Sequence, residues 1–545
     1  MYRPLAALAA LLCASAAAAQ PAPSVSPALP RQPALIVAIA VDQLSADLFA
    51  EYRPHFTGGL RRMADGVVFP AGYQSHAATE TCPGHATILT GARPSRSGII
   101  ANDWLDQSLS REDKVLYCSE DPSVPGSSSS RYTVSARQLL VPTLGDRIKA
   151  VTPASRVVAV STKDRGAVML GGHQADQLWW WNGRDFAGPA GQQPAPEVAA
   201  AFAAIRTRIA TAQPDLPLPP PCEARAQSVP IGDGKTVGTG RFGRAAGDLR
   251  AWRASPEADT ATIDIAIAMF ESLRLGRGDA PDLLALSASA PDYVGHTYGT
   301  GGSEQCLTLL SLDRELGRLF AALDRSGVRY VAVLTADHGG HDLPERNQAR
   351  AAPDAIRVDA RFDAKAVAAQ ISRELRLDVP ALLAQGADFY VHRDVPRRRR
   401  AAVLRRAAEL LGANPLVEEV LLGSELAAMP SPSRPPELWS LAERARASYF
   451  PGRSGDLVVA LKQRVTPIPD PRLGYVATHG SFWDYDRRVP ILFWWPGVVP
   501  FEQPLGVEVV DILPSLAPLI GLPLPAGEID GRCLDLDGGP GTTCR

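Results

Sequence analysis

A run of apolar residues, ALIVAIAV at Ala34–Val41, constrains the fold of this chain most strongly. A continuous run of this kind, without polar alternation, is typical of a central strand in a parallel sheet, which is buried on both faces. Similar runs follow at Arg156–Val160, Leu283–Ser287, Tyr330–Leu334 and Val489–Phe493. Helical patterns lie between them, at Ala136–Lys149, Ala258–Leu275 and Cys306–Ser326. The alternation predicts an α/β fold, a three-layer sandwich with a largely parallel central sheet.

Two segments, at about residues 171–255 and 341–475, interrupt this alternation. The first contains the run Trp179–Trp181, followed by Pro- and Gly-rich sequence. The second contains the strand-like Asp388–His392 and a basic helical stretch around Arg397–Leu411. We interpret both as insertions that form caps beside the functional site. Hydrophobic packing of a hairpin is favoured for the tryptophans over stacking on a substrate, and a solvated helix face is favoured for the arginines over an anion site.

The N-terminus has the pattern of a targeting segment. Residues 1–20 combine one arginine, an apolar stretch and the small residues Ala17–Ala19, as in a secretory signal peptide. The apolar stretch is short for a membrane span, which needs about 20 residues. Residues 21–33 are rich in Pro, Ala and Ser and are interpreted as a linker to a domain over residues 34–545. We therefore expect a periplasmic or secreted protein without stable membrane insertion.

Export makes the cysteines candidates for disulfides. Beyond Cys13, which lies in the predicted signal peptide, six remain, an even number that suits an oxidising compartment. Proximity favours the pair Cys533–Cys544, and we expect Cys82–Cys118 and Cys222–Cys306 as the other two. Free buried thiols are the alternative for any one pair.

The overall charge gives no reason to expect a nucleic-acid partner. The formal net charge is −2 at pH 7, and 46% of the residues are hydrophobic against 21% charged, as in an ordinary globular protein. A site for a phosphate group would therefore have to be assembled locally.

Polar residues follow four of the predicted strands. They are Asp42 after the first strand, Lys163 and Arg165 after the second, Asp292 and His296 after the third, and Asp337 and His338 after the fourth. In open α/β sheets, ligands bind beyond the carboxyl ends of the strands. We expect these side chains to meet at one edge of the sheet.

Several of these residues have the character of metal ligands. Asp292 and His296 are four residues apart, Asp337 and His338 are adjacent, and His479 is followed by glycine. Carboxylate and imidazole together suit Zn²⁺. With Asp42 there are six ligands, enough for two sites of three protein ligands each, and three ligands with an open position are the arrangement of catalytic zinc.

The segment TETCPGHATILTG, residues 79–91, offers candidate nucleophiles. Metal coordination can activate a threonine hydroxyl, and the helix that begins here would favour an anion at its N-terminus. Thr79, Thr81 and Thr87 compete for the role, and structural capping is the alternative for all three. Position alone does not choose among them.

The motifs VDQL, TETCPGHATILTGARPSRSGIIAND, STKDRG, PDYVGH, TADHGG and THG occur in this order. In this order they resemble the alkaline phosphatase superfamily and are most similar to the monomeric, PafA-like bacterial alkaline phosphatases. The nucleotide pyrophosphatase/phosphodiesterase branch shares much of the pattern. The resemblance covers roughly residues 34–340 and 450–520.

The resemblance implies a role for each matching residue. Thr81 would be the nucleophile and form a phosphothreonine. One zinc ion would be bound by Asp42, Asp337 and His338 and activate the nucleophile, and a second by Asp292, His296 and His479 and face the leaving group. Asn102, Lys163 and Arg165 would bind the phosphoryl oxygens. The implied protein is a monomeric hydrolase of small phosphorylated substrates that uses two Zn²⁺ ions.

Three other functions have to be weighed. A monoester carries more negative charge than a diester, and Lys163 with Arg165 suits that charge, whereas the diesterase branch generally lacks this pair. We therefore favour a phosphomonoesterase with diesterase side activity over a nucleotide pyrophosphatase/phosphodiesterase.

A sulfatase needs a modified residue in C-x-P-x-R, and here Cys82 is out of register while His85, interpreted as structural or supporting, stands where the Arg would be. An inactive metal-binding module would be expected to lack the nucleophile or the residues that bind the phosphoryl group, and this chain has both.

Overall fold

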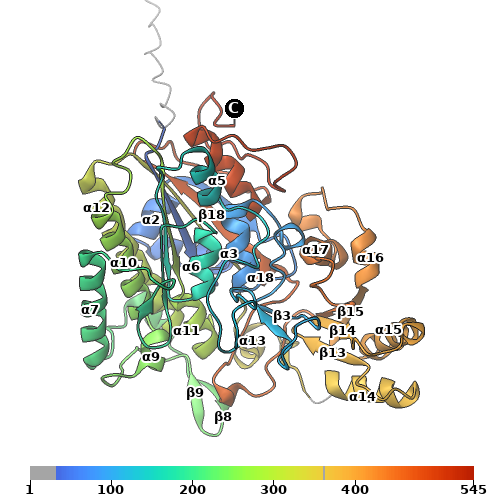
Figure 1. Cartoon of the computed structure of the whole chain (residues 1–545). Helices are drawn as coiled ribbons and strands as arrows, with labels where there is room; N and C mark the ends of the chain where they lie inside the picture. Colours follow the sequence, from blue (N-terminus) through green and yellow to red (C-terminus); the bar gives the residue numbers. More distant parts are fainter. Residues whose placement is uncertain (1–31, 360–361, 545) are drawn as a thin grey trace, which may run out of the picture.

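A ten-stranded sheet forms the centre of the computed structural model, which describes residues 32–359 and 362–544 (Figure 1). The predicted signal peptide, residues 1–20, and most of the linker, residues 21–33, lie outside the described residues. Among the helices of the described part, none is both long and apolar enough to cross a membrane.

The predicted apolar runs form the middle of this sheet. Neighbouring parallel strands are, in order, β6 (Gln177–Trp181), β5 (Val157–Ser161), β10 (Asp282–Ala288), β1 (Leu35–Val41) and β11 (Tyr330–Thr335). Every residue of β1, β5, β10 and β11 is buried, as continuous apolar runs require. Beyond β11 the antiparallel strand β18 (Arg488–Trp494) pairs in turn with β2 (Val67–Tyr73). The prediction of a largely parallel central sheet is confirmed.

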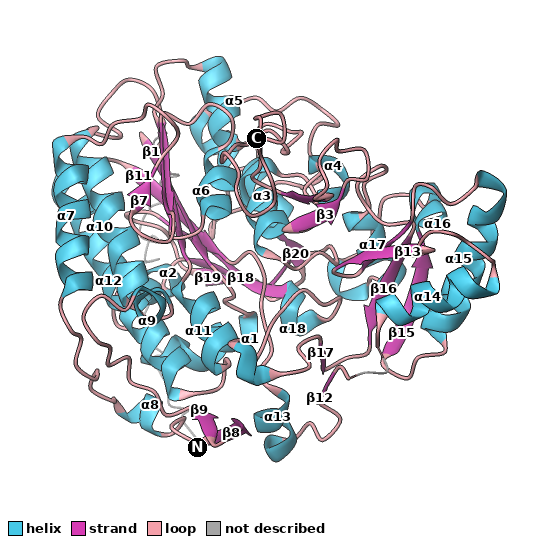
Figure 2. Cartoon of the chain, turned by 60° about the horizontal axis from the view of Figure 1, so that its bottom comes forward, coloured by secondary structure: helices cyan, strands magenta, loops and turns pink. Residues whose placement is uncertain are grey.

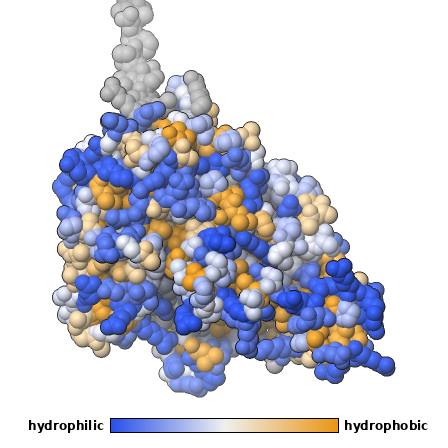
Figure 3. Space-filling model, in the orientation of Figure 1, coloured by the Kyte–Doolittle hydropathy of each residue, from blue (hydrophilic) through white to orange (hydrophobic). Residues whose placement is uncertain are grey.

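Helices cover both faces of the sheet, which gives the three layers of the sandwich (Figures 1 and 2). One layer contains α2 (Gly59–Ala64), α7 (Pro196–Ala210), α10 (Glu257–Ser272) and α12 (Ser303–Ser326). The other contains α3 (Thr81–Thr90), α5 (Leu144–Val151), α6 (Asp164–Gly171) and α19 (Ile512–Leu516). The face of the molecule in Figure 3 is mostly hydrophilic, with apolar residues in small separate patches.

Strand direction determines which loops meet. The parallel strands β5, β10, β1 and β11 all end at the same edge. Because β2 is antiparallel to β18 and β18 is antiparallel to β11, β2 also ends at this edge, while β18 begins there. Loops after five strands, and the loop before β18, therefore converge at one edge of the sheet.

The helix predicted over Ala136–Lys149 begins later than expected. Helix α5 starts at Leu144, and residues 136–143 are not helical. Thr143 caps the helix, since its hydroxyl accepts from the Asp146 amide at 3.2 Å and its own amide donates to the Asp146 carboxylate at 2.9 Å. Pro142 also disfavours helical geometry at the residue before it. The apolar pattern from residue 136 onward led to a helix prediction that was too long, although Pro142 and Thr143 mark the start of the helix in the sequence.

Segment 171–255, expected to be a cap, lies partly in the main sandwich. It supplies β6 to the central sheet and α7 to the helical layer against α10. The tryptophans pack in a hairpin of β6 with β7 (Phe186–Ala187): Trp181 lies 5.6 Å from the Phe186 ring and 4.5 Å from the Trp252 ring. They are part of the core, as favoured above, and only the later part of the segment is peripheral.

Segment 341–475 forms a subdomain beside the main sheet (orange in Figure 1). Its four-stranded sheet runs β13 (Leu382–Gln385), β14 (Asp388–Val391), β16 (Leu457–Leu461) and β15 (Val417–Leu422). Helices α14 (Ala364–Glu374) and α15 (Arg397–Gly412) pack on it and share an apolar core separate from the main one. Arg397, Arg398 and Arg399 are exposed on α15, which agrees with a solvated helix face.

Within residues 32–359 and 362–544, three disulfides link the chain, at Cys82–Cys118, Cys222–Cys306 and Cys533–Cys544, the pairs expected from the sequence. The second joins the short helix α8 (Pro220–Glu223) to α12. The first ties α3 to the strand β4 (Val115–Tyr117) region and so fixes a helix that reaches the converging loops.

The other two disulfides, Cys222–Cys306 and Cys533–Cys544, should differ in their contribution to stability. Cys222–Cys306 spans 84 residues and Cys533–Cys544 spans 11. Because a cross-link restricts the unfolded chain more when the loop is longer, we expect about 4.5 kcal/mol of stabilisation from the first and about 3 kcal/mol from the second. Urea unfolding of the two double alanine variants measures both, and an equal or larger loss for the tail pair would contradict this expectation.

Candidate active site

Thr81 is the first residue of α3 and only 1% exposed. The preceding residue, Glu80, does not cap the helix with its side chain. Two amides of the first turn are already used, because Cys82 donates to the Asn102 side chain and Gly84 to the Glu80 carbonyl, so the Thr81 amide is the group that could bind an anion. Gly84 allows the helix to lie against the end of β11, because a Cβ atom at this position would come within 2.0 Å of the Asp337 carbonyl oxygen. The sequence TCPGH thus places the Thr81 hydroxyl among the converging loops.

The other two candidate threonines point elsewhere. The Thr87 hydroxyl donates to the Pro83 carbonyl at 2.8 Å, within the helix. The Thr79 hydroxyl donates to the Ser481 carbonyl at 2.7 Å. Thr81 instead accepts a hydrogen bond from the Lys163 ammonium group at 3.2 Å. The structure therefore separates Thr81 from its two competitors, which the sequence pattern alone did not.

Asn102 lies beside the start of α3. The side-chain oxygen of Asn102 accepts from the Cys82 backbone amide at 2.8 Å, and the backbone amide of Asn102 donates to the Glu80 carboxylate at 2.8 Å. With the oxygen held by Cys82, the side-chain amino group is the part of Asn102 that can donate to a ligand. The Cys118 amide in turn donates to the Asn102 carbonyl at 2.9 Å, so the Cys82–Cys118 link supports both sides of this contact.

Asp42, Asp337 and His338 form one group of buried ligands, after β1 and β11. The His338 Nε2 atom lies 3.5 Å from Asp42 Oδ1 and 3.4 Å from Asp337 Oδ2. Asp42 Oδ1 and His338 Nε2 are both buried without a hydrogen-bond partner among the described residues. These are the three residues expected at the nucleophile side.

Asp292, His296 and His479 form a second group. Asp292 and His296 lie four residues apart on one side of α11 (Ala290–Tyr298). The Asp292 Oδ1 atom lies 3.3 Å from His296 Nε2 and 3.3 Å from His479 Nε2. His479 also stacks on His338 with ring centroids 3.6 Å apart. Among the described residues, the second set of ligand atoms close enough together for one ion is Asp292, His338 and His479, so His338 takes the place expected for His296 and the two groups adjoin.

All three histidines have the same ring nitrogen fixed by the backbone. Nδ1 lies 2.8 Å from the Gly339 carbonyl in His338, 2.9 Å from the Ala477 carbonyl in His296, and 2.8 Å from the Thr79 carbonyl in His479. A carbonyl only accepts, so Nδ1 carries the hydrogen, and in the neutral ring the Nε2 lone pair faces the carboxylates. Two acceptors facing each other need a cation between them.

Lys163 supplies a cation to this cluster in the structure. Its ammonium nitrogen lies 2.6 Å from Asp42 Oδ2 and 2.6 Å from Asp292 Oδ2. Burial alone would lower the pKa of Lys163, but Asp292 and Asp42 outweigh it and raise that pKa. Burial and the neighbouring Asp337 raise the pKa of Asp42 well above its ordinary value. One ammonium group does not compensate three buried carboxylates.

Burial also keeps one imidazole neutral. It lowers the pKa of His338 to about 3, so this ring presents a lone pair and no charge at neutral pH. Unpaired carboxylate oxygens, a neutral imidazole and backbone-fixed tautomers together fit divalent cations of the kind that oxygen and nitrogen ligands prefer. The six residues could hold two such ions.

Arg165 reaches the site from the first turn of α6. Its guanidinium donates to the Tyr117 hydroxyl at 3.3 Å, and that hydroxyl donates to Asp164 at 2.7 Å. The Tyr132 hydroxyl donates to the other Asp164 oxygen at 2.8 Å. Arg165 is therefore held by a tyrosine–aspartate network, and no carboxylate of the described part of the chain pairs with it directly, which leaves its charge available to an anion.

Two residues support the ligands, of which Gln43 was not assigned from the sequence and His85 was. Gln43 donates from its side-chain Nε2 to Asp292 Oδ1 at 3.0 Å and from its backbone amide to Asp337 Oδ1 at 3.2 Å, which connects the two ligand groups. His85, read only as structural or supporting, lies 2.9 Å from Asp337 Oδ2 through Nδ1 and 2.8 Å from the Ser287 hydroxyl through Nε2. Adjacency to Asp42 was the one signal for Gln43.

Comparison with a family model gives a match over most of the chain. Residues 36–482 match the family described as type I phosphodiesterase / nucleotide pyrophosphatase. The match includes all six of the acidic and histidine ligands and Thr81.

Individual relatives are similar over nearly their full length. The chain is 53% identical over 518 residues to alkaline phosphatase PhoK of Sphingomonas sp., which covers 94% of this chain and 92% of that protein. The crystal structure of alkaline phosphatase PafA superposes with a TM-score of 0.79 at 26% identity, over 93% of this chain and 99% of the other. A PafA variant that replaces a threonine, an asparagine, a lysine and an arginine superposes with a TM-score of 0.77 at 25% identity, over 93% and 99%.

Replacing His85 should weaken cation binding without removing a ligand. In His85→Ala the Asp337 carboxylate loses its buried imidazole partner, and loss of such a supporting contact typically costs about 10- to 100-fold in metal affinity. Competition against a chelator measures the affinity. His173→Ala, which removes a histidine paired with Asp146 at 3.0 Å, is the matched control and should bind metal as the wild type does. Equal affinities for both variants would refute the role of His85.

Proposed function

Since the chain belongs to the type I phosphodiesterase / nucleotide pyrophosphatase family, we propose that it is an exported phosphate monoester hydrolase, an alkaline phosphatase. In this proposal Thr81 is the nucleophile, and two zinc ions are held by the two ligand groups. Relatives named alkaline phosphatase over more than nine-tenths of the chain support the activity.

The contact of Lys163 with Thr81 carries the proposal. The ammonium group lies 3.2 Å from the Thr81 hydroxyl oxygen, at the carboxyl edge of the sheet and between the carboxylates of both ligand groups. A cation at this distance from the nucleophile would lie against the non-bridging oxygens of a phosphoryl group attacked by Thr81. Those oxygens carry the extra charge that distinguishes a monoester from a diester.

The chain's own residues divide the work of the reaction. The Thr81 hydroxyl gives up its proton and Oγ1 forms the bond to phosphorus while the bond to the leaving oxygen breaks. The leaving oxygen takes up a proton and departs as the alcohol, and a phosphothreonine results. The Thr81 amide, the Asn102 amino group, Lys163 and Arg165 would bind the non-bridging oxygens, whose charge is spread over three atoms. Hydrolysis of the phosphothreonine then releases phosphate and restores the hydroxyl.

The proposed metal ions would act on both ends of this displacement. Asp42, Asp337 and His338 would hold one ion and Asp292, His296 and His479 the other. Two such ions supply Lewis acidity that stabilises the attacking and the leaving oxygen. With cations bound to Asp42 and Asp292, Lys163 would no longer be needed by these carboxylates and could pair with the substrate.

The competing function is hydrolysis of diesters, as in the nucleotide pyrophosphatase/phosphodiesterase branch. A diester has one charge fewer and gains less from Lys163 and Arg165. The PafA variant altered at a threonine, an asparagine, a lysine and an arginine, in that order, carries changes at the four residue types assigned here to Thr81, Asn102, Lys163 and Arg165. This agreement supports the same set of functional residues in this chain.

Export and a monomeric state are part of the same proposal. Three disulfides among the described residues suit an oxidising compartment, the periplasm or the medium. The resemblance to monomeric phosphatases supports a single chain that acts on small phosphorylated molecules.

The nucleophile can be tested among the three threonines. Thr81→Ala should lower kcat for an aryl phosphate by about 10⁴-fold or more, since loss of a covalent nucleophile removes the main pathway. Thr81→Ser should retain much of the activity because it keeps the hydroxyl. Thr87→Ala is the matched control, because the Thr87 hydroxyl bonds to Pro83 and His76 and not to the proposed site. Full turnover by Thr81→Ala would reject the assignment.

The preference for monoesters can be tested at the basic pair. In Lys163→Ala/Arg165→Ala, kcat/KM should fall at least about tenfold more for phenyl phosphate than for its methyl diester, because each contact to a charged oxygen is worth about 1.5–3 kcal/mol. Arg131→Ala is the control, since Arg131 lines the same cavity as Lys163 but donates to the Gly126 carbonyl at 3.1 Å. If both substrates lose equally, the monoesterase argument fails.

A further inference from the structure

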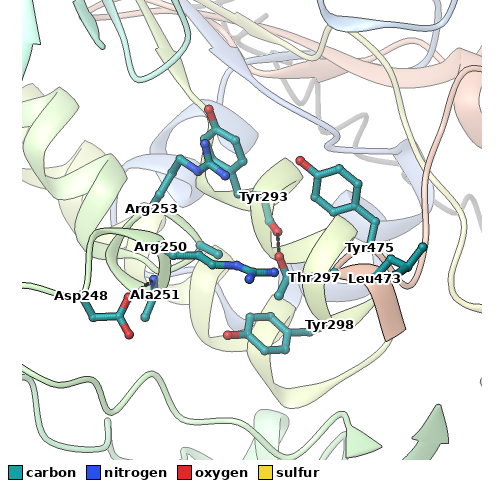
Figure 4. Close-up of a pocket in the computed structure, with 11 residues that line it drawn as sticks. Asp248, Arg250, Ala251, Arg253, Tyr293, Thr297, Tyr298, Leu473 and Tyr475 are labelled. Carbon is teal, nitrogen blue, oxygen red and sulfur yellow. Dashed lines mark hydrogen bonds between the residues drawn. The ribbon is translucent and has the colours of Figure 1, made fainter. Parts of the chain in front are cut away.

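A second cavity adjoins the ligand group of Asp292, His296 and His479. It has a volume of about 420 Å³, which suits a small organic molecule, and is shown in Figure 4. Its walls come from α9 (Leu249–Arg253), from α11 and from the loop after the short helix η3 (Pro471–Leu473). The later parts of both segments expected to be caps therefore contribute to it.

Helix α11 connects this cavity to the proposed metal site. Asp292 and His296, four residues apart, lie on the side of the helix that faces the proposed metal site. Tyr293 and Thr297, each one residue further on, line the cavity. Tyr475 continues the contact from the other wall, because its ring lies 4.7 Å from the His296 ring. The Tyr293 ring also lies 5.2 Å from the Lys163 ammonium nitrogen. The cavity thus begins where the leaving oxygen would be in the proposed reaction.

Two arginines line this cavity without a carboxylate partner. Among the described residues, no carboxylate oxygen lies within 4.0 Å of a nitrogen of the Arg250 or Arg253 guanidinium, whereas Arg472, next to the lining residue Leu473, pairs with Asp233 and Asp470. Arg253 lies over the Tyr293 ring at 4.8 Å, which positions it without neutralising it. Figure 4 shows the Arg250 side chain extended between Tyr298 and Tyr475.

The remaining walls are partly apolar. Leu473 is 85% exposed and Tyr475 is 49% exposed, although both are large apolar or aromatic side chains that usually find cover. Both line this cavity together with Tyr298. One acidic residue, Asp248, is also present, but its carboxylate accepts from the Ala251 amide at 2.9 Å and caps α9. The cavity therefore offers apolar walls with an excess of positive charge.

We propose that this cavity binds the leaving alcohol of the substrate and favours alcohols that carry a second anionic group, a carboxylate or a phosphate-type group, through Arg250 and Arg253. The inference rests on the proposed phosphomonoesterase function and names its substrate class. Guanidinium groups can bind either anion through two parallel hydrogen bonds. Phosphorylated hydroxy acids and bisphosphates are molecules of this class.

Matched aryl phosphates can test the selection. Phenyl phosphate, 4-carboxyphenyl phosphate and 4-phosphonophenyl phosphate differ in the charge of the leaving group, and 4-(trimethylammonio)phenyl phosphate reverses it. The measured quantity is kcat/KM of each charged substrate relative to phenyl phosphate. In Arg250→Gln/Arg253→Gln, this ratio should fall about three- to tenfold for the two anionic substrates and rise for the cationic one. The two anionic arms show which anion the cavity prefers.

Controls separate this inference from the proposed function. Arg405→Gln removes one exposed positive charge from the distant helix α15 and should leave every ratio unchanged. Arg250→Gln alone avoids disturbing the Arg253–Tyr293 contact, and Arg250→Lys should recover part of the ratio. No hydrolysis of phenyl phosphate by the wild type would refute the function itself. Hydrolysis with ratios that do not change in the arginine variants would refute only the leaving-group site.

A binding measurement gives a readout that does not depend on turnover. Titration of the Thr81→Ala protein with 4-carboxyphenyl phosphate should show a Kd several-fold higher when Arg250→Gln/Arg253→Gln is added. The Kd for phenyl phosphate should change less. Equal changes for the two ligands would contradict selection by charge.

Discussion

The buried negative charge of Asp42, Asp292 and Asp337 is the constraint on which the rest of the site depends. Each carboxylate is almost fully buried, and burial of an ionised group is costly unless it is paired. Lys163 contacts two of the three, and the Nε2 lone pairs of the histidines add acceptors to the same space. Such a cluster is stable only with cations in it, and the same cations would serve the proposed reaction.

Sheet topology brings this charge together. The ligands follow separate strands far apart in the sequence, and only the common direction of β5, β10, β1 and β11 places their ends side by side. The antiparallel strand β18 contributes through the loop before it, which carries His479. Helix α3 then adds Thr81, and its close approach to Asp337 at Gly84 leaves no room for a larger residue. The core thus positions the chemistry without contributing to it.

The central strands could be predicted from the sequence because continuous apolar runs of this length are typical of buried strands in a parallel sheet. The candidate ligands could be predicted because they directly follow those runs. The order of motifs, not local pattern, singled out Thr81 from Thr79 and Thr87. Other features depended on tertiary contacts. Strand β6 was assigned to a cap because the segment 171–255 as a whole interrupts the alternation of strands and helices. The role of Gln43 needed both ligand groups in place, and the cavity at Arg250 is formed by segments that are distant in the sequence.

The number of zinc ions bound per chain tests the central claim most directly. Native mass spectrometry of the chelated and then zinc-titrated protein should show two ions per chain, with activity on phenyl phosphate recovered only as the ions are restored. Asp42→Asn and Asp292→Asn should each reduce the number to one, because these residues belong to different ligand groups. A chain that binds no zinc, or that keeps two ions in both variants, would contradict the account.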